Sequence, residues 1–126
     1  MLCPSCSQPL IVLELDNVEI DHCLGCGGVW LDAGELGLIL HGRPDAAEAE
    51  WLSSSRPGVR RCPMCRAKMN LATLPKSGVE IDLCVRRHGM WLDKGELQQI
   101  IGAEAGDGRV GKLREVCAKI FGAEKS

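Results

Sequence analysis

The sequence contains few aromatic side chains. They make up 3% of its 126 residues: three tryptophans, one phenylalanine and no tyrosine. Large aromatic side chains supply much of the apolar area that a small core buries, so this scarcity points to another source of stability. Domains below about 40 residues usually need disulfides, metal ions or partner chains to fold. The chain is therefore expected to draw stability from cross-links or bound metal.

Long apolar runs are also missing. No segment approaches the roughly 18 apolar residues that a membrane-spanning helix requires, so no membrane association is expected. No apolar export signal precedes Cys3, which follows Met1 and Leu2 directly. The protein is therefore expected in the cytoplasm, where paired thiols more often bind metal than form disulfides. The eight cysteines are interpreted as metal ligands, with disulfides as the rival interpretation.

Charge is unevenly distributed along the chain. Residues 1–50 carry nine Asp and Glu against one Arg, whereas residues 51–126 carry eight against fourteen Lys and Arg. Two halves of opposite sign can attract each other or different partners. A basic group in the second half is either a solvated surface or an anion-binding patch. Its members are Arg60, Arg61, Arg66, Lys68, Arg86 and Arg87.

The chain contains an internal repeat. Cys-Pro-x-Cys begins at Cys3 and again at Cys62, and each copy continues with Val-Glu-Ile-Asp and Trp-Leu-Asp-x-Gly-Glu-Leu. The offset between the copies is 59 residues at these cysteines and 61 at Trp30 and Trp91. The second copy has therefore gained two residues in between. Insertions are tolerated best at loop tips, so a hairpin tip is expected there.

Each copy is predicted to form a β-hairpin. The strands are residues 10–15 and 18–22 in the first copy, and residues 71–74 and 79–83 in the second. The Asp16-Asn17 turn of the first copy has side chains that tolerate positive φ, and a two-residue turn pairs Leu15 with Val18. The second copy has a four-residue turn, which accounts for its extra length.

A short helix is predicted after each Trp-Leu-Asp. Each helix start carries an Asp and, three residues later, a Glu: Asp32 with Glu35, and Asp93 with Glu96. This spacing is typical of a capping box, although a basic partner or another metal ion are alternative roles for these acids. The helices are expected to end near His41 and Ile101, where Gly42 and Gly102 follow.

Two further helices are predicted outside the repeats. One covers residues 46–53, and the Ser-, Arg-, Pro- and Gly-containing residues 53–58 follow it as a linker. The other lies at the C-terminus, where apolar residues recur at helical spacing. They are Val110, Leu113, Val116, Cys117, Ile120 and Phe121. That apolar stripe must be buried on a ribbon, on a second subunit or on a partner.

Two tryptophans and two histidines that are not metal ligands have expected positions in the fold. Trp30 and Trp91 are expected to pack against their own cysteine turn and helix, with partner recognition as the alternative. His22 is expected on a strand surface. His41 is expected at a helix C-terminus, where the helix dipole favours a cation.

The cysteines of the first copy predict a zinc site. Their spacing, C-x2-C-x16-C-x2-C, lies in the window of four-thiolate sites. The ligands are Cys3, Cys6, Cys23 and Cys26. Four protein ligands complete a tetrahedral zinc shell and leave no open position for a substrate. Because no Ser/His/Asp set or phosphate-binding glycine loop accompanies it, the protein is not expected to be an enzyme.

The second copy predicts a second zinc site with a different fourth ligand. Its cysteines are Cys62, Cys65 and Cys84. Arg87 stands where Cys26 stood, and His88 follows, giving C-x2-C-x18-C-x3-H. An imidazole is longer than a thiol side chain, so it can reach the ion from one residue further on, and three cysteines with one histidine are a common structural zinc set. Two alternatives are a second copy that has lost its site, and Cys117 as the fourth ligand.

The repeated motifs resemble a known family. CPxC, VEID and G-[VM]-WLD-x-GEL, with the cysteine cluster between them, are similar to the transcription-factor-IIB-type zinc-finger family over about residues 2–40 and 62–101. The resemblance implies a zinc-ribbon fold and zinc binding, and it implies function only weakly. The second copy departs from the four-cysteine pattern at Arg87.

The expected fold is a small metal-stabilised α+β protein with two Zn²⁺ ions. It has two tandem zinc ribbons, each a β-hairpin with two zinc knuckles and a following short helix, and a C-terminal amphipathic helix. The expected segments are ribbon 1 at residues 1–42 with its four cysteine ligands, a helical linker at 43–59, ribbon 2 at 60–102 with three cysteine ligands and His88, and the terminal helix at 103–126.

The expected function is a non-enzymatic interaction module associated with transcription. A protein partner is favoured over nucleic acid bound through the basic ribbon 2, because scarce aromatics argue against stacking of single-stranded bases. A thiol redox switch that releases zinc on oxidation is one alternative. Iron bound by the four cysteines, with an electron-transfer role, is the other.

Overall fold

The computed structural model describes residues 1–43, 47–105 and 108–121, and within them the predicted α+β class is confirmed. The strands are β1 (Ile11–Leu15), β2 (Val18–His22), β3 (Val29–Asp32), β4 (Arg56–Arg61), β5 (Lys68–Thr73), β6 (Glu80–Leu83) and β7 (Gly89–Leu92). The helices are α1 (Glu35–His41), α2 (Ala47–Ser53), α3 (Glu96–Glu104) and α4 (Val110–Phe121). None of these helices has the length and apolar character needed to cross a bilayer.

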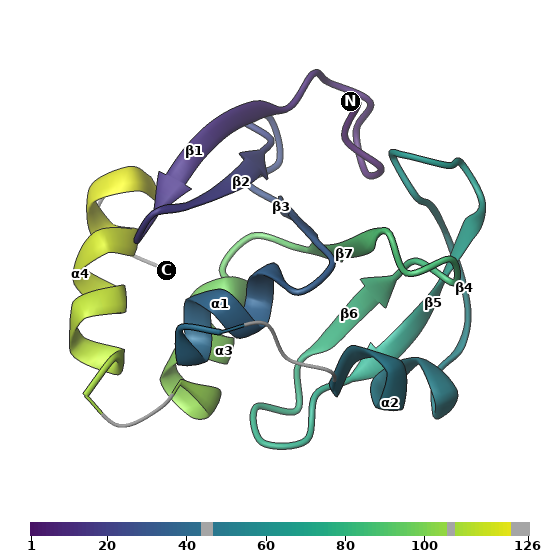
Figure 1. The fold of residues 1–126 in the computed structure, drawn as a ribbon. Helices are drawn as coiled ribbons and strands as arrows, with labels where there is room; N and C mark the ends of the chain where they lie inside the picture. The colour runs from purple at the N-terminus through teal and green to yellow at the C-terminus, as the bar shows by residue number, and fades with distance from the viewer. Residues whose placement is uncertain (44–46, 106–107, 122–126) are drawn as a thin grey trace.

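The strands of both copies form one antiparallel sheet. Their order is β1-β2-β3-β7-β6-β5-β4, so the first copy supplies one half of the sheet and the second copy the other (Figure 1). The two halves join where β3 pairs with β7, with Trp30 opposite Trp91. The sequence predicts the hairpins but neither the third strand of each copy nor this junction. Four-residue strands are too short to show a periodic pattern.

The hairpin of the first copy follows its turn chemistry. Asp16 and Asn17 adopt φ of 51° and 68°, and Leu15 lies opposite Val18, as the two-residue turn predicts. This register places Ile20 and His22 on the core side of β2, because side chains alternate along a strand. His22 is therefore buried rather than exposed as expected. Its Nδ1 lies 3.1 Å from the Gly28 carbonyl oxygen, and burial lowers its pKa.

Strand β4 corrects the predicted linker. The linker is expected to include residues 56–59, but these residues belong to a strand that pairs with β5. Pro57 and Gly58 disguise it, because both residues normally argue against a strand. A proline is tolerated at an edge strand or a bulge, and β4 is an edge strand with a register shift between Pro57 and Arg61.

The helix ends agree with the sequence in the first copy only. Helix α1 stops at His41, and Gly42 follows in the left-handed conformation with φ 75°. Helix α3 continues past Gly102 to Glu104, which corrects its expected end at Ile101. Gly102 therefore lies inside α3 and is not a helix terminator, and a Cβ there would meet only the guanidinium end of Arg114. The expected start of α2 at Ala46 lies outside the described residues.

The terminal helix buries its stripe on its own chain. Leu113 and Cys117 are buried in the main apolar core with Leu15, Ile20 and residues of α1 and α3. Val116, Ile120 and Phe121 pack at the margin of this core. Figure 1 shows α4 beside β1, with α1 and α3 next to it. Contacts within the chain therefore account for the apolar pattern of this helix.

Candidate metal centres

The first cysteine cluster has the geometry of a tetrahedral site. The Sγ atoms of Cys3, Cys6, Cys23 and Cys26 all lie within 4.8 Å of one another. Two of the separations are 3.6 Å, for Cys3 to Cys26, and 3.3 Å, for Cys6 to Cys23. A tetrahedral zinc ion with Zn–S bonds of about 2.3 Å separates its sulfurs by about 3.8 Å. The donor set therefore fits one zinc ion.

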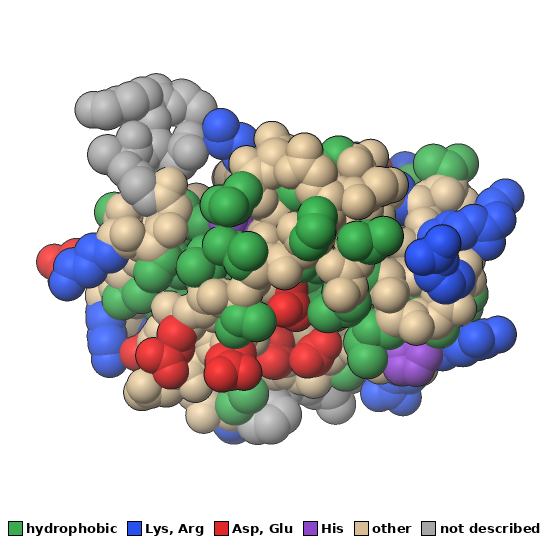
Figure 2. Space-filling model, turned by 90° about the horizontal axis from the view of Figure 1, so that it is seen from above, with side chains coloured by type: hydrophobic (Ala, Val, Ile, Leu, Met, Phe, Trp, Pro, Cys, Tyr) green, Lys and Arg blue, Asp and Glu red, His purple; other side chains and the backbone are tan. Residues whose placement is uncertain are grey.

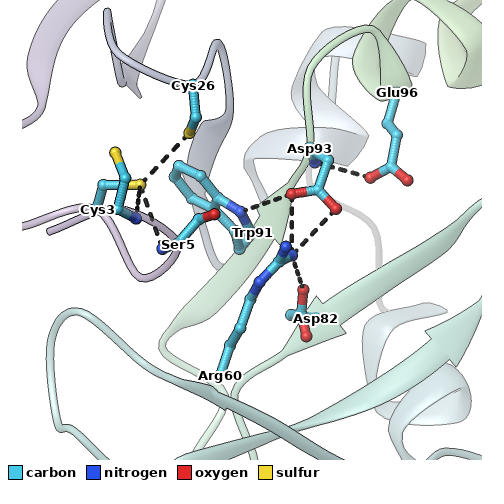
Figure 3. Close-up of polar contacts among 9 residues, drawn as sticks. Cys3, Ser5, Cys26, Arg60, Asp82, Trp91, Asp93 and Glu96 are labelled. Atoms are coloured by element: carbon cyan, nitrogen blue, oxygen red, sulfur yellow. Dashed lines mark hydrogen bonds and ion pairs between the residues drawn. The ribbon is translucent and has the colours of Figure 1, made fainter. Parts of the chain in front are cut away.

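Backbone amides around the first cluster also favour a metal-bound thiolate. The N–H groups of Ser5 and Cys6 each donate to Cys3 Sγ at 3.3 Å, as the dashed lines at Cys3 in Figure 3 show. Cys26 N–H points to Cys23 Sγ at 3.5 Å. Each turn is closed by the first cysteine's carbonyl, which accepts from Ser7 in one case and from Gly27 in the other. Such N–H···S bonds stabilise the charged ligand and orient it.

The second cluster includes the imidazole. Ligand atoms of Cys62, Cys65, Cys84 and His88 all lie within 4.8 Å of one another. Cys84 Sγ lies 3.7 Å from Cys65 Sγ and 3.5 Å from His88 Nδ1. These separations match the edges of a zinc tetrahedron with about 2.3 Å to sulfur and about 2.0 Å to nitrogen. The two clusters together fit two zinc ions.

Cys117 lies outside both clusters. It is 2% exposed and belongs to the apolar core beneath α4. Burial raises the pKa of its thiol to about 11, so it stays neutral and packs as a small apolar side chain. His88 is therefore the fourth donor of the second cluster in the structure.

Before a metal ion binds, the thiols of the second cluster differ in pKa. The Ala67 N–H lowers the pKa of Cys65 to about 6, whereas burial raises the pKa of Cys62 to about 11. A bound dication makes every coordinating thiol a thiolate, and binding therefore releases protons. Zinc supplies a structural cross-link here, because four protein donors leave no open coordination position.

Removal of the imidazole tests the second donor set. We expect His88→Ala to lower the zinc content from two ions to one, because three thiolates remain and the fourth position opens to water. Arg87→Ala, at the adjacent exposed side chain, should retain two ions. Native mass spectrometry after zinc loading gives both numbers. Two tightly held ions in His88→Ala would show that the imidazole is incidental.

The two tryptophans lie between the clusters. Trp30 and Trp91 are fully buried, in one apolar group that also contains buried cysteines of both sites. A Cβ on Gly28 would lie 2.1 Å from Trp91 Cζ2, and a Cβ on Gly89 would lie 2.7 Å from Trp30 Cζ2. Each indole thus covers the glycine beside the other copy's cysteine turn. Both indoles are packed as expected, and their contacts with these glycines cross the junction, which the sequence did not predict.

The Asp and Glu residues repeated at the helix starts do not form complete capping boxes. Trp30 Nε1 donates to Asp32 at 3.0 Å, and Trp91 Nε1 donates to Asp93 at 3.2 Å. The Asp side chains therefore bind indoles, and no side chain caps α1 or α3. The Glu half of the box is present, because Glu35 accepts the Asp32 N–H at 2.8 Å. The equivalent bond of Glu96 is drawn in Figure 3.

One residue of the basic group is held inside the fold. Arg60, on β4, places Nη1 3.0 Å from Asp82 and 2.9 Å from Asp93 (Figure 3). Asp82 is buried, and the arginine compensates its charge. No sequence pattern predicts this triad, because its members come from three separate segments of the second copy. Arg60 is therefore not a free member of the basic patch.

The first copy has the same acids without that arginine. Burial, followed by repulsion from Asp32, Asp21 and Glu19, raises the pKa of Glu35 to about 7. Burial also raises the pKa of Glu96, its counterpart, but Arg60 opposes that shift. Below about pH 7, Glu35 therefore stays protonated in the folded first copy. In the unfolded chain the same side chain loses its proton above its ordinary pKa of about 4.3.

This shift predicts a pH-dependent effect of Glu35→Gln. The protonated wild-type side chain contributes stability below the unfolded pKa, and that contribution is lost as pH rises through 7. The variant should be more stable than the wild type at both pH values, and its advantage should grow from pH 5.5 to pH 8 by about 1 kcal/mol after allowance for solvent screening. Gln keeps an acceptor for the Asp32 N–H. Urea unfolding of the zinc-loaded proteins at both pH values measures the difference, and equal stability at pH 8 would contradict it.

The fold and the two tetrahedral donor sets define a zinc-ribbon protein. The chain belongs to the transcription factor zinc-finger family, whose model matches residues 2–41 and 61–103, one segment for each copy. Neither the curated proteins nor the solved structures give a significant match. The family resemblance drawn from the repeated motifs is thereby confirmed.

Proposed function

We propose that this protein is a non-enzymatic, transcription-associated interaction module that binds a partner protein. The observation that carries the proposal is that both donor sets are complete at four, so the ions fix a shape and have no position for a substrate. The turns that hold the ligands present apolar side chains outward. Leu24 is 71% exposed, Met64 51% and Val85 41%. Aliphatic groups held in water by a rigid turn favour a protein partner.

The charge distribution supports the same choice of partner. Arg60 is taken up by two aspartates, and the remaining basic residues of ribbon 2 are exposed around its knuckles. They are Arg61, Arg66, Lys68, Arg86 and Arg87. Figure 2 shows Lys and Arg at both ends of this face, Asp and Glu along its lower edge, and apolar side chains between them. A mixed surface of this kind suits a protein better than a continuous phosphate backbone.

A capture experiment tests the proposal. Zinc-loaded protein is used as bait in nuclease-treated native extract, beside Cys23→Ser and Cys117→Ala. Cys23→Ser removes one zinc ligand, and Cys117→Ala removes a thiol outside both clusters. We expect a partner that the wild type and Cys117→Ala retain and Cys23→Ser loses. Identical retention by all three baits, or none above background, would overturn the proposal.

The nucleic-acid alternative has its own test. Mobility-shift titrations of the full chain with duplex and single-stranded DNA and RNA are run at several salt concentrations. We expect no retardation that weakens steeply with salt. Phosphate contacts would give such a salt dependence, and charge reversal at Arg66 and Arg86 would reduce it. Tight, salt-sensitive binding would replace the protein partner by nucleic acid.

A further inference from the structure

Strand β1 presents an open edge. It is an end strand of the sheet, and no other strand of the described residues pairs along its outer side. Leu10 donates its N–H to the Met1 carbonyl at 3.1 Å on that side. Because backbone groups alternate along a strand, the N–H and C=O groups of Val12 and Glu14 face the same side. Unpaired groups of this kind are a template for another strand.

The second copy contains a strand in the equivalent place. Val12 lies opposite Asp21, and Leu71 lies opposite Asp82, so Val12 and Leu71 are counterparts. Leu71 pairs on its other side with Arg56 of β4. The first copy shows the beginning of the same arrangement, because the bridge Leu2↔Pro9 corresponds to the pair Arg61↔Lys68. The described residues do not continue that pairing along β1.

Strand β4 brings two arginines to the acids of its own copy. Arg56 forms an ion pair with Glu80, and Arg60 lies between Asp82 and Asp93. Planar guanidinium groups pair with carboxylates through two directed N–H bonds, which gives both energy and orientation. The second copy is thus a complete example of how an arginine-bearing strand docks on this sheet edge.

The first copy keeps the acids but not the arginines. Glu19, Asp21, Asp32 and Glu35 occupy the repeat positions of Glu80, Asp82, Asp93 and Glu96. In the described part of the chain, no Lys or Arg forms an ion pair with any of these four. The high pKa of Glu35 has the same origin, since three neighbouring carboxylates add to its burial. Val12, beside Asp21, is 60% exposed.

Helix α4 does not take the place of the missing strand. It packs on the core side of the sheet through Leu113 and Cys117. Lys112 of α4 and Arg109, the residue just before the helix, bind Asp16 at the hairpin turn. The acids of the first copy and the outer edge of β1 therefore remain uncovered by this helix.

We propose that the outer edge of β1 binds an extended, arginine-bearing segment of the partner protein. Met1 and Leu2 occupy the places of Arg60 and Arg61 beside this edge, so the segment adds antiparallel to β1 next to Val12 and Glu14. It places an arginine against Glu19, as β4 places Arg56 against Glu80. This mode is β-augmentation, in which main-chain bonds give affinity and the side chains select the ligand. It rests on the proposed function, because it takes the partner to be a protein.

The experiment uses the chain's own strand as a probe. A capped peptide with the sequence of Ser54–Val59, Ser-Ser-Arg-Pro-Gly-Val, is titrated into the full, zinc-loaded protein and followed by NMR. It stops before the two positions that Met1 and Leu2 occupy. We expect slower hydrogen exchange at the amides of Val12 and Glu14. A peptide with citrulline for arginine keeps the shape without the charge, and it should bind at least about tenfold more weakly.

Variants of the protein separate the acids from general charge. Glu19→Gln should weaken binding several-fold, whereas Glu50→Gln, an equal charge change at an exposed site on α2, should not. Native mass spectrometry confirms two zinc ions in each variant, so loss of fold is not mistaken for loss of binding. Glu19 is exposed on β2, so Glu19→Gln leaves the apolar core unchanged.

The outcomes distinguish this site from the proposed function. Equal binding of both peptides, no binding, or shifts confined to the knuckles would overturn the β1 site. A partner captured from extract with undiminished strength by Glu19→Gln would leave the interaction module intact and remove this docking edge. Conversely, peptide protection of β1 without any zinc-dependent partner would support the edge and count against the module.

Discussion

Chelation of zinc is expected to unfold the protein. The sulfurs of each cluster lie within 4.8 Å of one another, and without an ion their ionised forms repel. Structural zinc contributes on the order of 10–16 kcal/mol of apparent binding energy in small fingers, which is comparable to or larger than the roughly 5–15 kcal/mol stability typical of whole domains. We therefore expect far-UV dichroism and the buried-tryptophan fluorescence to change together on addition of a strong chelator.

Single substitutions give the matched comparison. Cys23→Ser should lose one ion and unfold at a much lower denaturant concentration than the wild type. Cys117→Ala removes a buried thiol that no cluster contains, and it should cost only about 1–2 kcal/mol as a small cavity. Native mass spectrometry and urea unfolding measure both. A metal-free protein that keeps its near-UV tryptophan signal would contradict the expectation.

Gly89→Ala is expected to have the second large effect. A Cβ at this position would lie 2.2 Å from the Leu31 carbonyl oxygen and 3.0 Å from Asp32 Cα. Both atoms belong to the backbone of β3, so no side-chain rotation relieves the overlap, and β3 and β7 must separate. The free energy of unfolding should fall by about 3 kcal/mol, at the upper end for overpacked sites. Urea unfolding under saturating zinc measures this loss.

Gly111→Ala is the matched control for that substitution. A Cβ on Gly111 meets no atom within 4 Å, and the residue lies inside α4. Alanine should stabilise the helix by about 0.5–1 kcal/mol. Hydrogen exchange then locates the damage in Gly89→Ala, which should appear in strands of both copies. A loss below about 1 kcal/mol, or one confined to a single copy, would show that the junction is not tight.

The junction joins the two small repeats in one sheet. Trp91 covers Gly28 beside the first cluster, and Trp30 covers Gly89 beside the second. Each indole is then fixed by its own aspartate, Asp32 or Asp93. A disturbance at one cysteine turn therefore reaches the strand that supports the other. Loss of either ion should therefore loosen both halves of the sheet.

The sequence by itself determined the features that depend on neighbours along the chain. The spacing of the cysteines and His88 selects the eight donors, and the structure brings them together. The Asp16-Asn17 turn determines the register of the first hairpin. These features are local, because knuckles and tight turns depend on a few adjacent backbone angles and side chains.

Only the tertiary structure decided how the copies join. Strand β4 is concealed by Pro57 and Gly58, whose tolerance depends on a place at the edge of the sheet. The pairing of β3 with β7, the exchange of the tryptophans and the contact of Arg60 with Asp93 each unite residues far apart in the chain. Such contacts depend on which apolar face is left to bury once the local units have formed, and no local pattern encodes that choice.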